Sequence, residues 1–176
     1  MKYIVLLRKV NVGVENRIDK NSLEDAFHAL GYKNVQVYIN SGNVIFNSAK
    51  GKSAIGKEID EALLVLFKAK IQFLIKTLAE MKEIRKAIPD EWENNTDQKT
   101  DIAYLFPDVD NPGIVDELPF KKEYVKVKYV KGALIMNVPR EHQNKSQYSK
   151  LVGSKAYKSM TLRNVNTARY LSDLSD

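Results

Sequence analysis

The sequence predicts an α+β protein made of two ferredoxin-like (βαββαβ) subdomains in tandem, each an antiparallel sheet with helices packed on it. Two observations support this prediction. Short runs of apolar residues alternate with stretches in which apolar residues recur at helical spacing. The same order of elements then recurs after a polar, turn-rich segment near the middle of the chain.

The first half supplies one complete βαββαβ unit. Residues 2–7 (KYIVLL) are a short apolar strand, and an irregular loop leads from them to the first helix. That helix is expected to open at the capping-box-like Ser22–Asp25 and to stop at Gly31. The remaining expected elements are strands at 35–39, 44–47 and 71–75, a helix with an apolar stripe over 55–67, and a further helix capped at 77–80 that runs to about 87.

The second half repeats this order. Residues 89–100 (PDEWENNTDQKT) are the expected linker between a first subdomain at 1–88, which includes the connecting helix, and a second at 101–176. The expected elements are a strand at 102–106, a short helix at 112–118, a hairpin of 124–130 with 133–138, a helix at 146–152, a strand at 160–163 and a helix at 165–174.

Composition narrows the functional classes. The 176 residues include 44% hydrophobic residues and no Cys, which excludes disulfides, a thiolate nucleophile and a Cys-based zinc site. No window approaches a membrane span, and the early apolar run is shorter than a signal peptide requires, so we expect a soluble cytoplasmic protein without membrane contact. The net charge of +6 favours anionic partners, although a surface rich in solvating lysine is an open alternative.

The predicted topology brings two polar segments together. With the strand order 4-1-3-2, the exit of the first strand and the hairpin between the second and third strands share one edge of the sheet. Arg8, Asn11 and Gly13 should therefore lie beside the turn formed by Asn40, Ser41, Gly42 and Asn43. Backbone amides and one arginine would form an anion nest there. Alternatively, the turn satisfies its own backbone groups and Arg8 pairs with an acid.

Four spaced motifs carry a resemblance to a known family. LLRKVNVG at 6–13, YINSGNVIF at 38–46, SKLVG at 149–153 and TLRNVNT at 161–167 resemble the signature segments of the bacterial family catalogued as domain of unknown function 1697. The resemblance implies two ferredoxin-like subdomains and no established activity. Lys9 and Val14 stand where the family usually has Gly, and Val165 stands where it usually has Trp.

The sequence contains few residues that could bind a metal or a cofactor. His28 and His142 are the only histidines and lack ligand-like spacing, so we expect neither a metal nor a cofactor. Ser149-Lys150 has basic and aromatic neighbours, which are Lys145, Tyr148, Lys155, Tyr157 and Lys158. This cluster would bind a phosphate backbone, or it would simply be the solvated face of an amphipathic helix.

The function expected from these features is a binding module for an anionic, phosphate-bearing small molecule. Its expected ligand-binding residues are Arg8, Asn11, Asn40, Ser41, Gly42 and Asn43, with Lys150, Arg163 and Asn164 as further contributors. An enzyme of unknown chemistry at the same edge stays open, although no residue is an obvious general base. Weak, sequence-independent nucleic-acid binding through diffuse charge also stays open. The sequence leaves the ligand's identity and the oligomeric state undetermined.

Overall fold

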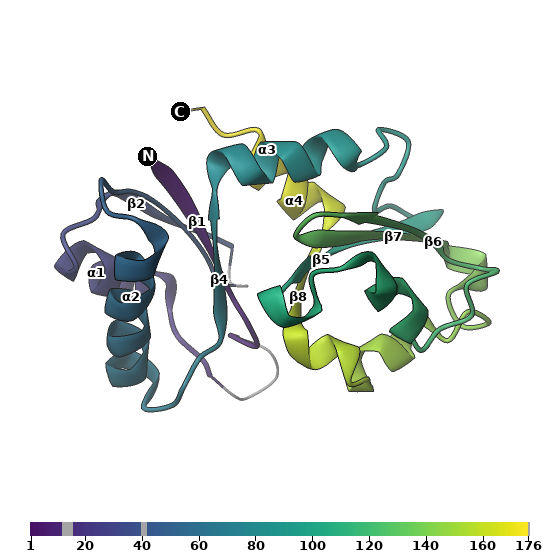
Figure 1. Ribbon diagram of the computed structural model, residues 1–176, viewed down its shortest axis with the longest axis horizontal. Coiled ribbons are helices and arrows are strands. Elements are labelled where there is room, and N and C mark those ends of the chain that lie inside the picture. The colour runs from purple at the N-terminus through teal and green to yellow at the C-terminus, as the bar shows by residue number, and fades with distance from the viewer. Residues whose placement is uncertain (12–15, 40–41, 176) are drawn as a thin grey trace. The chain divides into compact units, whose positions relative to one another are not determined.

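The computed structural model describes residues 1–11, 16–39 and 42–175 (Figure 1). It is a mixed α/β structure with two four-stranded antiparallel sheets and helices. The chain divides into two compact units, Met1–Glu80 together with Ser175, and Met81–Leu174. Within the described ranges, no helix is both long enough and apolar enough to cross a membrane.

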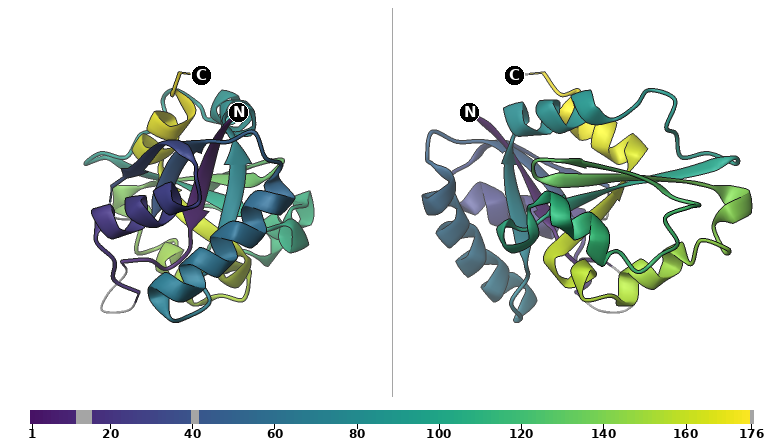
Figure 2. Two further views of the ribbon diagram at one scale, coloured as in Figure 1. Left: turned by 90° about the vertical axis from the view of Figure 1, so that its left-hand side faces the viewer. Right: turned by 45° about the vertical axis from the view of Figure 1, so that its right-hand side comes forward.

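The first unit is a sheet in the order β2-β3-β1-β4, with every neighbouring pair antiparallel. Helices α1 and α2 lie on one face of this sheet, as the views in Figure 1 and Figure 2 show. The strands are β1 (Lys2–Leu7), β2 (Lys33–Tyr38), β3 (Asn43–Asn47) and β4 (Phe73–Thr77), and the helices are α1 (Lys20–Ala29) and α2 (Lys52–Phe67).

The core of the first unit follows the two periodicities that the sequence displays. Tyr3, Val5 and Leu7 alternate along β1 and point to the face covered by α1 and α2. The helices bury their apolar stripes on that face, and the rings of Tyr32 and Phe46 stack with centroids 4.3 Å apart. The buried helical residues are Leu23 and Phe27 of α1 and Ile55, Ile59 and Leu63 of α2.

The start of α1 differs from its prediction. Asp19, rather than Ser22, is the N-cap, and its carboxylate accepts the backbone N–H of Ser22 at 2.9 Å. The helix therefore begins at Lys20. The capping box at Thr77 is confirmed, because Thr77 Oγ1 accepts the Glu80 backbone N–H at 3.2 Å and Glu80 accepts the Thr77 N–H at 2.7 Å.

The second unit has a sheet in the order β6-β7-β5-β8, so equivalent strands take equivalent places in the two sheets. Its pairs are also antiparallel. The strands are β5 (Gln98–Leu105), β6 (Lys126–Val130), β7 (Ala133–Pro139) and β8 (Met160–Asn164). Two α-helices contribute to this unit, α4 (Val165–Ser172) and most of α3 (Leu78–Ala87).

Short 3-10 helices replace two expected helices in the second unit. The segments predicted as helical at 112–118 and 146–152 are 3-10 turns, because Pro112, Gly113 and Gly153 punctuate segments too short to form stable α-helices. The 3-10 helices are η1 (Pro107–Val109), η2 (Pro112–Glu117), η3 (Arg140–His142), η4 (Tyr148–Gly153) and η5 (Ala156–Ser159).

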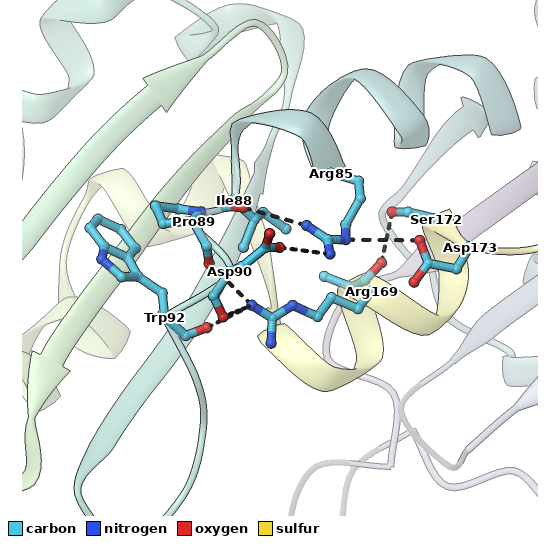
Figure 3. Close-up of polar contacts among 9 residues, drawn as sticks. Arg85, Ile88, Pro89, Asp90, Trp92, Arg169, Ser172 and Asp173 are labelled. Atoms are coloured by element: carbon cyan, nitrogen blue, oxygen red, sulfur yellow. Dashed lines mark hydrogen bonds and ion pairs between the residues drawn. The ribbon is translucent and has the colours of Figure 1, made fainter.

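Two arginines fasten the turn that follows α3 (Figure 3). Arg169 on α4 donates through Nη2 to the backbone carbonyls of Pro89, Asp90 and Trp92 at 3.0–3.1 Å. Arg85 on α3 donates to the Asp90 carboxylate at 3.1 Å. The first residues of the expected linker are therefore bound to α4, and its last residues belong to β5, which begins at Gln98.

Candidate functional site

The end of β1 and the β2–β3 hairpin meet at one edge of the first sheet, as predicted. The Leu7 backbone N–H donates to the Gly42 carbonyl at 2.8 Å. Gly42 has φ +70°, and a Cβ built on it would lie 2.8 Å from the Leu7 Cβ. Both the backbone conformation and the close approach therefore require glycine at this position. Asn40 and Ser41, the other residues expected in this turn, lie outside the described residues.

Asn43 is a structural residue of this hairpin. Its side chain is fully buried, and Nδ2 donates to the Tyr38 carbonyl at 3.0 Å. Asn43 also stands opposite Leu6 of β1 and Tyr38 of β2 in the sheet register. The side chain expected to bind a ligand thus links the two strands of the hairpin at their tip.

Asn11 closes the loop that follows β1. Its Nδ2 donates to the Ile18 carbonyl at 3.0 Å, and its Oδ1 accepts the Ile18 N–H at 2.8 Å. Asn16 supports the same closure by donating to the Lys9 carbonyl at 3.1 Å. The two asparagines therefore hold the ends of a loop whose middle, residues 12–15, lies outside the described residues.

Arg8 is the cation that the fold places at this edge. Its side chain is 9% exposed, and Nη1 donates to the Gln72 Oε1 at 3.2 Å. The Arg8 backbone N–H donates to the Gln72 carbonyl at 2.8 Å, which fixes the start of the loop against the segment entering β4. Sequence reasoning missed Gln72, because nothing local marks a residue that is 64 positions from its partner.

Left-handed backbone conformations accumulate around this edge. Lys9, Asn11, Asn16 and Ile39 have φ between +49° and +55°. Such values are uncommon outside glycine, and they are most strained for a β-branched residue such as Ile39. Lys9 occupies a position where the resembling family usually has Gly, and its φ of +55° explains that preference.

The described walls of this edge enclose only a small depression. Asn11 and Gly42 line it together, with Asp19 and Lys20 at the start of α1, and its volume is about 10 Å³. That volume holds about one water molecule. We name this edge the β1 rim and define it by Arg8, Lys9, Asn11, Ile39 and Gly42.

Three predicted site residues belong to the second unit, where two of them have structural contacts. Arg163 on β8 is 6% exposed, and it donates to Thr161 Oγ1 at 3.0 Å and to the Leu162 carbonyl at 2.7 Å. Burial lowers the pKa of its guanidinium to about 10. Asn164 is the N-cap of α4, since its Oδ1 accepts the backbone N–H of Thr167 at 2.9 Å. Lys150 is exposed on η4.

Val165, which replaces the family's usual Trp, is fully buried at the start of α4. The residue at this position therefore contributes to the packing of the second unit. Val14, the other departure, lies outside the described residues.

A buried polar cluster in the second unit was not apparent from the sequence. Asp101 on β5 is 6% exposed and accepts a hydrogen bond from the Tyr148 hydroxyl at 3.0 Å. Lys99 lies 3.4 Å from the same carboxylate and 5.3 Å from the centre of the Tyr148 ring. Burial first, and the charge of Asp101 second, raise the pKa of Tyr148 well above its usual value. The residues that the structure describes include no group of His, Cys, Asp or Glu suited to hold a metal ion.

These features define an α+β protein of two four-stranded sheets with a polar, conformationally strained edge on its first sheet. Its architecture is similar to that of the conserved bacterial protein SP0830 from Streptococcus pneumoniae, with a TM-score of 0.83 and 22% sequence identity. The match covers 97% of this chain and 96% of the other. At this identity the likeness concerns the fold alone.

The chain belongs to the family described as "Protein of unknown function (DUF1697)", whose model matches residues 1–135. No curated protein matches the sequence. The matched range includes the whole β1 rim.

Proposed function

We propose that this protein is a binding module for an anionic, phosphate-bearing ligand, which the β1 rim of the first unit recognises. The observation that carries the proposal is the position of Arg8. A guanidinium that is 9% exposed is held by Gln72 at an edge where the backbone turns repeatedly into left-handed conformations. Arginine is the preferred partner of phosphate, because its planar fork matches two phosphate oxygens.

A fold assignment underlies this proposal. We propose that each unit is a ferredoxin-like subdomain, and the matching orders β2-β3-β1-β4 and β6-β7-β5-β8 support it. In that topology, the end of β1 and the β2–β3 hairpin lie at the same edge of the sheet. The hydrogen bond between Leu7 and Gly42 agrees with this arrangement.

The strained backbone is the second line of support. Each non-glycine residue in the left-handed region costs on the order of 1–2 kcal/mol relative to its usual conformations. Such costs are most often retained where the backbone serves a binding site, because the surrounding fold must impose them. Lys9 and Ile39 carry this cost within one edge, and Asn11 and Asn16 carry a smaller one, because asparagine adopts this region more readily. Because the side chains of Asn11 and Asn43 hold the loop and the hairpin in place, the groups that would contact the ligand are Arg8 and backbone amides.

Charge at the rim agrees with an anionic ligand. Lys9, Arg17 and Lys20 are exposed on the loop after β1 and at the start of α1, and Asp19 is the one carboxylate among the described residues that line the depression. Hydrogen bonds from the Ser22 side chain and backbone hold the pKa of Asp19 below its usual value. Asp19 is therefore a poor general base, and the alternative of an enzyme at this rim gains no support from it. We also propose a cytoplasmic location, consistent with the absence of Cys.

A thermal-shift screen tests the proposed function. Wild-type protein, Arg8→Ala and Lys57→Ala are heated with inorganic phosphate and with a set of phosphorylated small molecules. Lys57 is exposed on α2, so its removal matches the loss of charge without touching the rim. A ligand at about 100 times its Kd stabilises the protein by about 2.7 kcal/mol.

We expect at least one phosphorylated compound to stabilise wild type and Lys57→Ala equally and to leave Arg8→Ala unchanged. Stabilisation of all three proteins to the same extent would place the ligand elsewhere. A complete lack of stabilisation across phosphorylated compounds would remove the proposed ligand class.

A further inference from the structure

The basic charge of this protein is concentrated in one segment. Residues 142–172, between Glu141 and Asp173, contain six Lys and Arg residues and no Asp or Glu. The formal net charge of the whole chain is also +6, so the other residues contain equal numbers of acidic and basic side chains. General solubility would not require such segregation, because it is served by charges of both signs mixed over the surface.

The structure sorts these six cations into two groups. Arg163 is a buried residue of β8, and Arg169 donates to the carbonyls of Pro89, Asp90 and Trp92 (Figure 3). The four lysines are all exposed on or beside η4 and η5. We call them the lysine face, and they are Lys145, Lys150, Lys155 and Lys158.

Packing explains why the lysines point outward. Tyr148, Leu151 and Ala156 of the same segment are buried in the core of the second unit. The 3-10 helices therefore cover one face of the sheet with their apolar residues and leave the intervening lysines to solvent. The resulting surface is cationic on one side and anchored to the core on the other.

The lysine face is not neutralised by neighbouring acids within the part of the chain that the structure describes. None of its four lysines forms an ion pair among these residues. Two carboxylates accept hydrogen bonds from side chains of the segment among the described residues. Asp108 accepts a hydrogen bond from Ser159 at 2.7 Å, and Asp101 is buried beneath Tyr148. Neither carboxylate forms an ion pair with a lysine of the lysine face.

Aromatic stacking on bases is excluded at Tyr148. Its ring is 4% exposed and stacks on Phe120 with centroids 5.4 Å apart, and its hydroxyl is bound to Asp101. Single-stranded nucleic acid is usually bound by exposed aromatic platforms in a basic groove. Tyr157, the other tyrosine of residues 145–158, is half-buried and packs against the core of the second unit. A surface of lysines without an exposed aromatic platform contacts phosphates alone, and the denser charge of a duplex favours it.

We propose that the lysine face binds the phosphate backbone of double-stranded nucleic acid without regard to base sequence. This site lies in the second unit and is independent of the ligand proposed for the β1 rim. Lysine ammonium groups act as point charges on phosphate, and their binding energy comes mainly from the release of condensed counterions. An anionic membrane is the less suitable partner, because Val152 is the one exposed large apolar side chain among residues 145–158, all of which the structure describes.

Salt-dependent binding tests this proposal. Fluorescence anisotropy follows a labelled DNA duplex of arbitrary sequence as protein is added at several NaCl concentrations. The first variant replaces all four lysines of the lysine face with Gln. The control variant makes the same change of charge at four exposed lysines of the first unit, which are Lys33, Lys57, Lys68 and Lys70.

For wild type we expect a Kd on the order of 10⁻⁴ to 10⁻⁶ M near physiological salt. The slope of log K against log salt should be about −3.6, if each of the four lysines neutralises one phosphate. The lysine-face variant should lose most of this slope, and the control variant should keep it. When the duplex is added to the wild-type protein, the NMR chemical shifts of the backbone amides should change mainly at residues 145–158. This measurement tests the site without any substitution.

Four outcomes would overturn the proposal. Wild type could fail to bind duplex at low salt, or the two quadruple variants could lose equal slope, which would indicate diffuse charge. Amide shifts outside residues 145–158 would place the duplex on another surface. Binding to anionic lipid vesicles but not to DNA would identify a membrane surface instead.

Discussion

Gly42 offers a direct test of how the β1 rim is built. Its φ of +70° lies in the left-handed region, and an added Cβ would meet the Leu7 Cβ at 2.8 Å. Gly31, at the end of α1, also has a positive φ of +78°, but nothing lies within 4 Å of a Cβ placed there. The two glycines therefore share the conformational requirement and differ in the steric one.

The expected losses of stability follow from this difference. Gly31→Ala should lower the free energy of unfolding by about 1 kcal/mol. Alanine is strained in the left-handed region, but it loses less conformational entropy on folding than glycine does, which offsets part of that strain. Gly42→Ala should cost about 2–4 kcal/mol, because the contact with Leu7 adds the penalty of overpacking. The Leu7 Cβ is fixed to the backbone of β1, so the contact is relieved only by moving a strand.

Urea unfolding followed by circular dichroism measures both variants, and amide hydrogen exchange in β1 assigns the loss to the first unit. Equal losses for Gly31→Ala and Gly42→Ala would refute the steric argument. A loss below about 1 kcal/mol at Gly42 would also refute the requirement for a left-handed backbone there.

Three further outcomes are expected. Lys9→Gly should raise the free energy of unfolding by about 0.5–1 kcal/mol in urea titrations, because glycine relieves the left-handed strain. Arg169→Met should cost about 2–4 kcal/mol by leaving three carbonyls without their donor, and it should change the fluorescence of Trp92. The pKa of Glu58 is lowered first by its hydrogen bond from Lys50, so its contribution to stability should be present above pH 4.5 and lost as pH falls through the lowered value. Glu58→Gln should remove this part of the pH dependence of the melting temperature between neutral and acidic buffer.

Local signals in the sequence predicted much of the fold. Gly42 indicated the tight hairpin, Thr77 and Glu80 indicated the capping box of α3, and both were confirmed. Asp19 and Ser22 are both good N-caps, so the sequence pattern did not fix the first residue of α1. The cap was decided by the position of the Asp19 carboxylate over the Ser22 N–H.

The candidate site was harder to predict, because its contacts are tertiary. The polar turn and the cation were recognised, but the bond between Arg8 and Gln72 joins residues 64 positions apart. Asn11 and Asn43 were expected to bind a ligand, whereas their side chains hold the loop and the hairpin. An asparagine that supports a turn and one that binds a ligand look alike in a sequence, since both follow a strand.

The role of Arg8 is the central claim, and unfolding of Arg8→Ala in urea without any ligand tests it most directly. If the guanidinium serves a bound anion, its removal should leave the free energy of unfolding within about 1 kcal/mol of wild type, since residues kept for function add little stability. Lys57→Ala serves as the control for loss of one positive charge. A loss of about 3–5 kcal/mol in Arg8→Ala, without a comparable loss in the control, would show that Arg8 is a buried structural partner and would contradict the binding site.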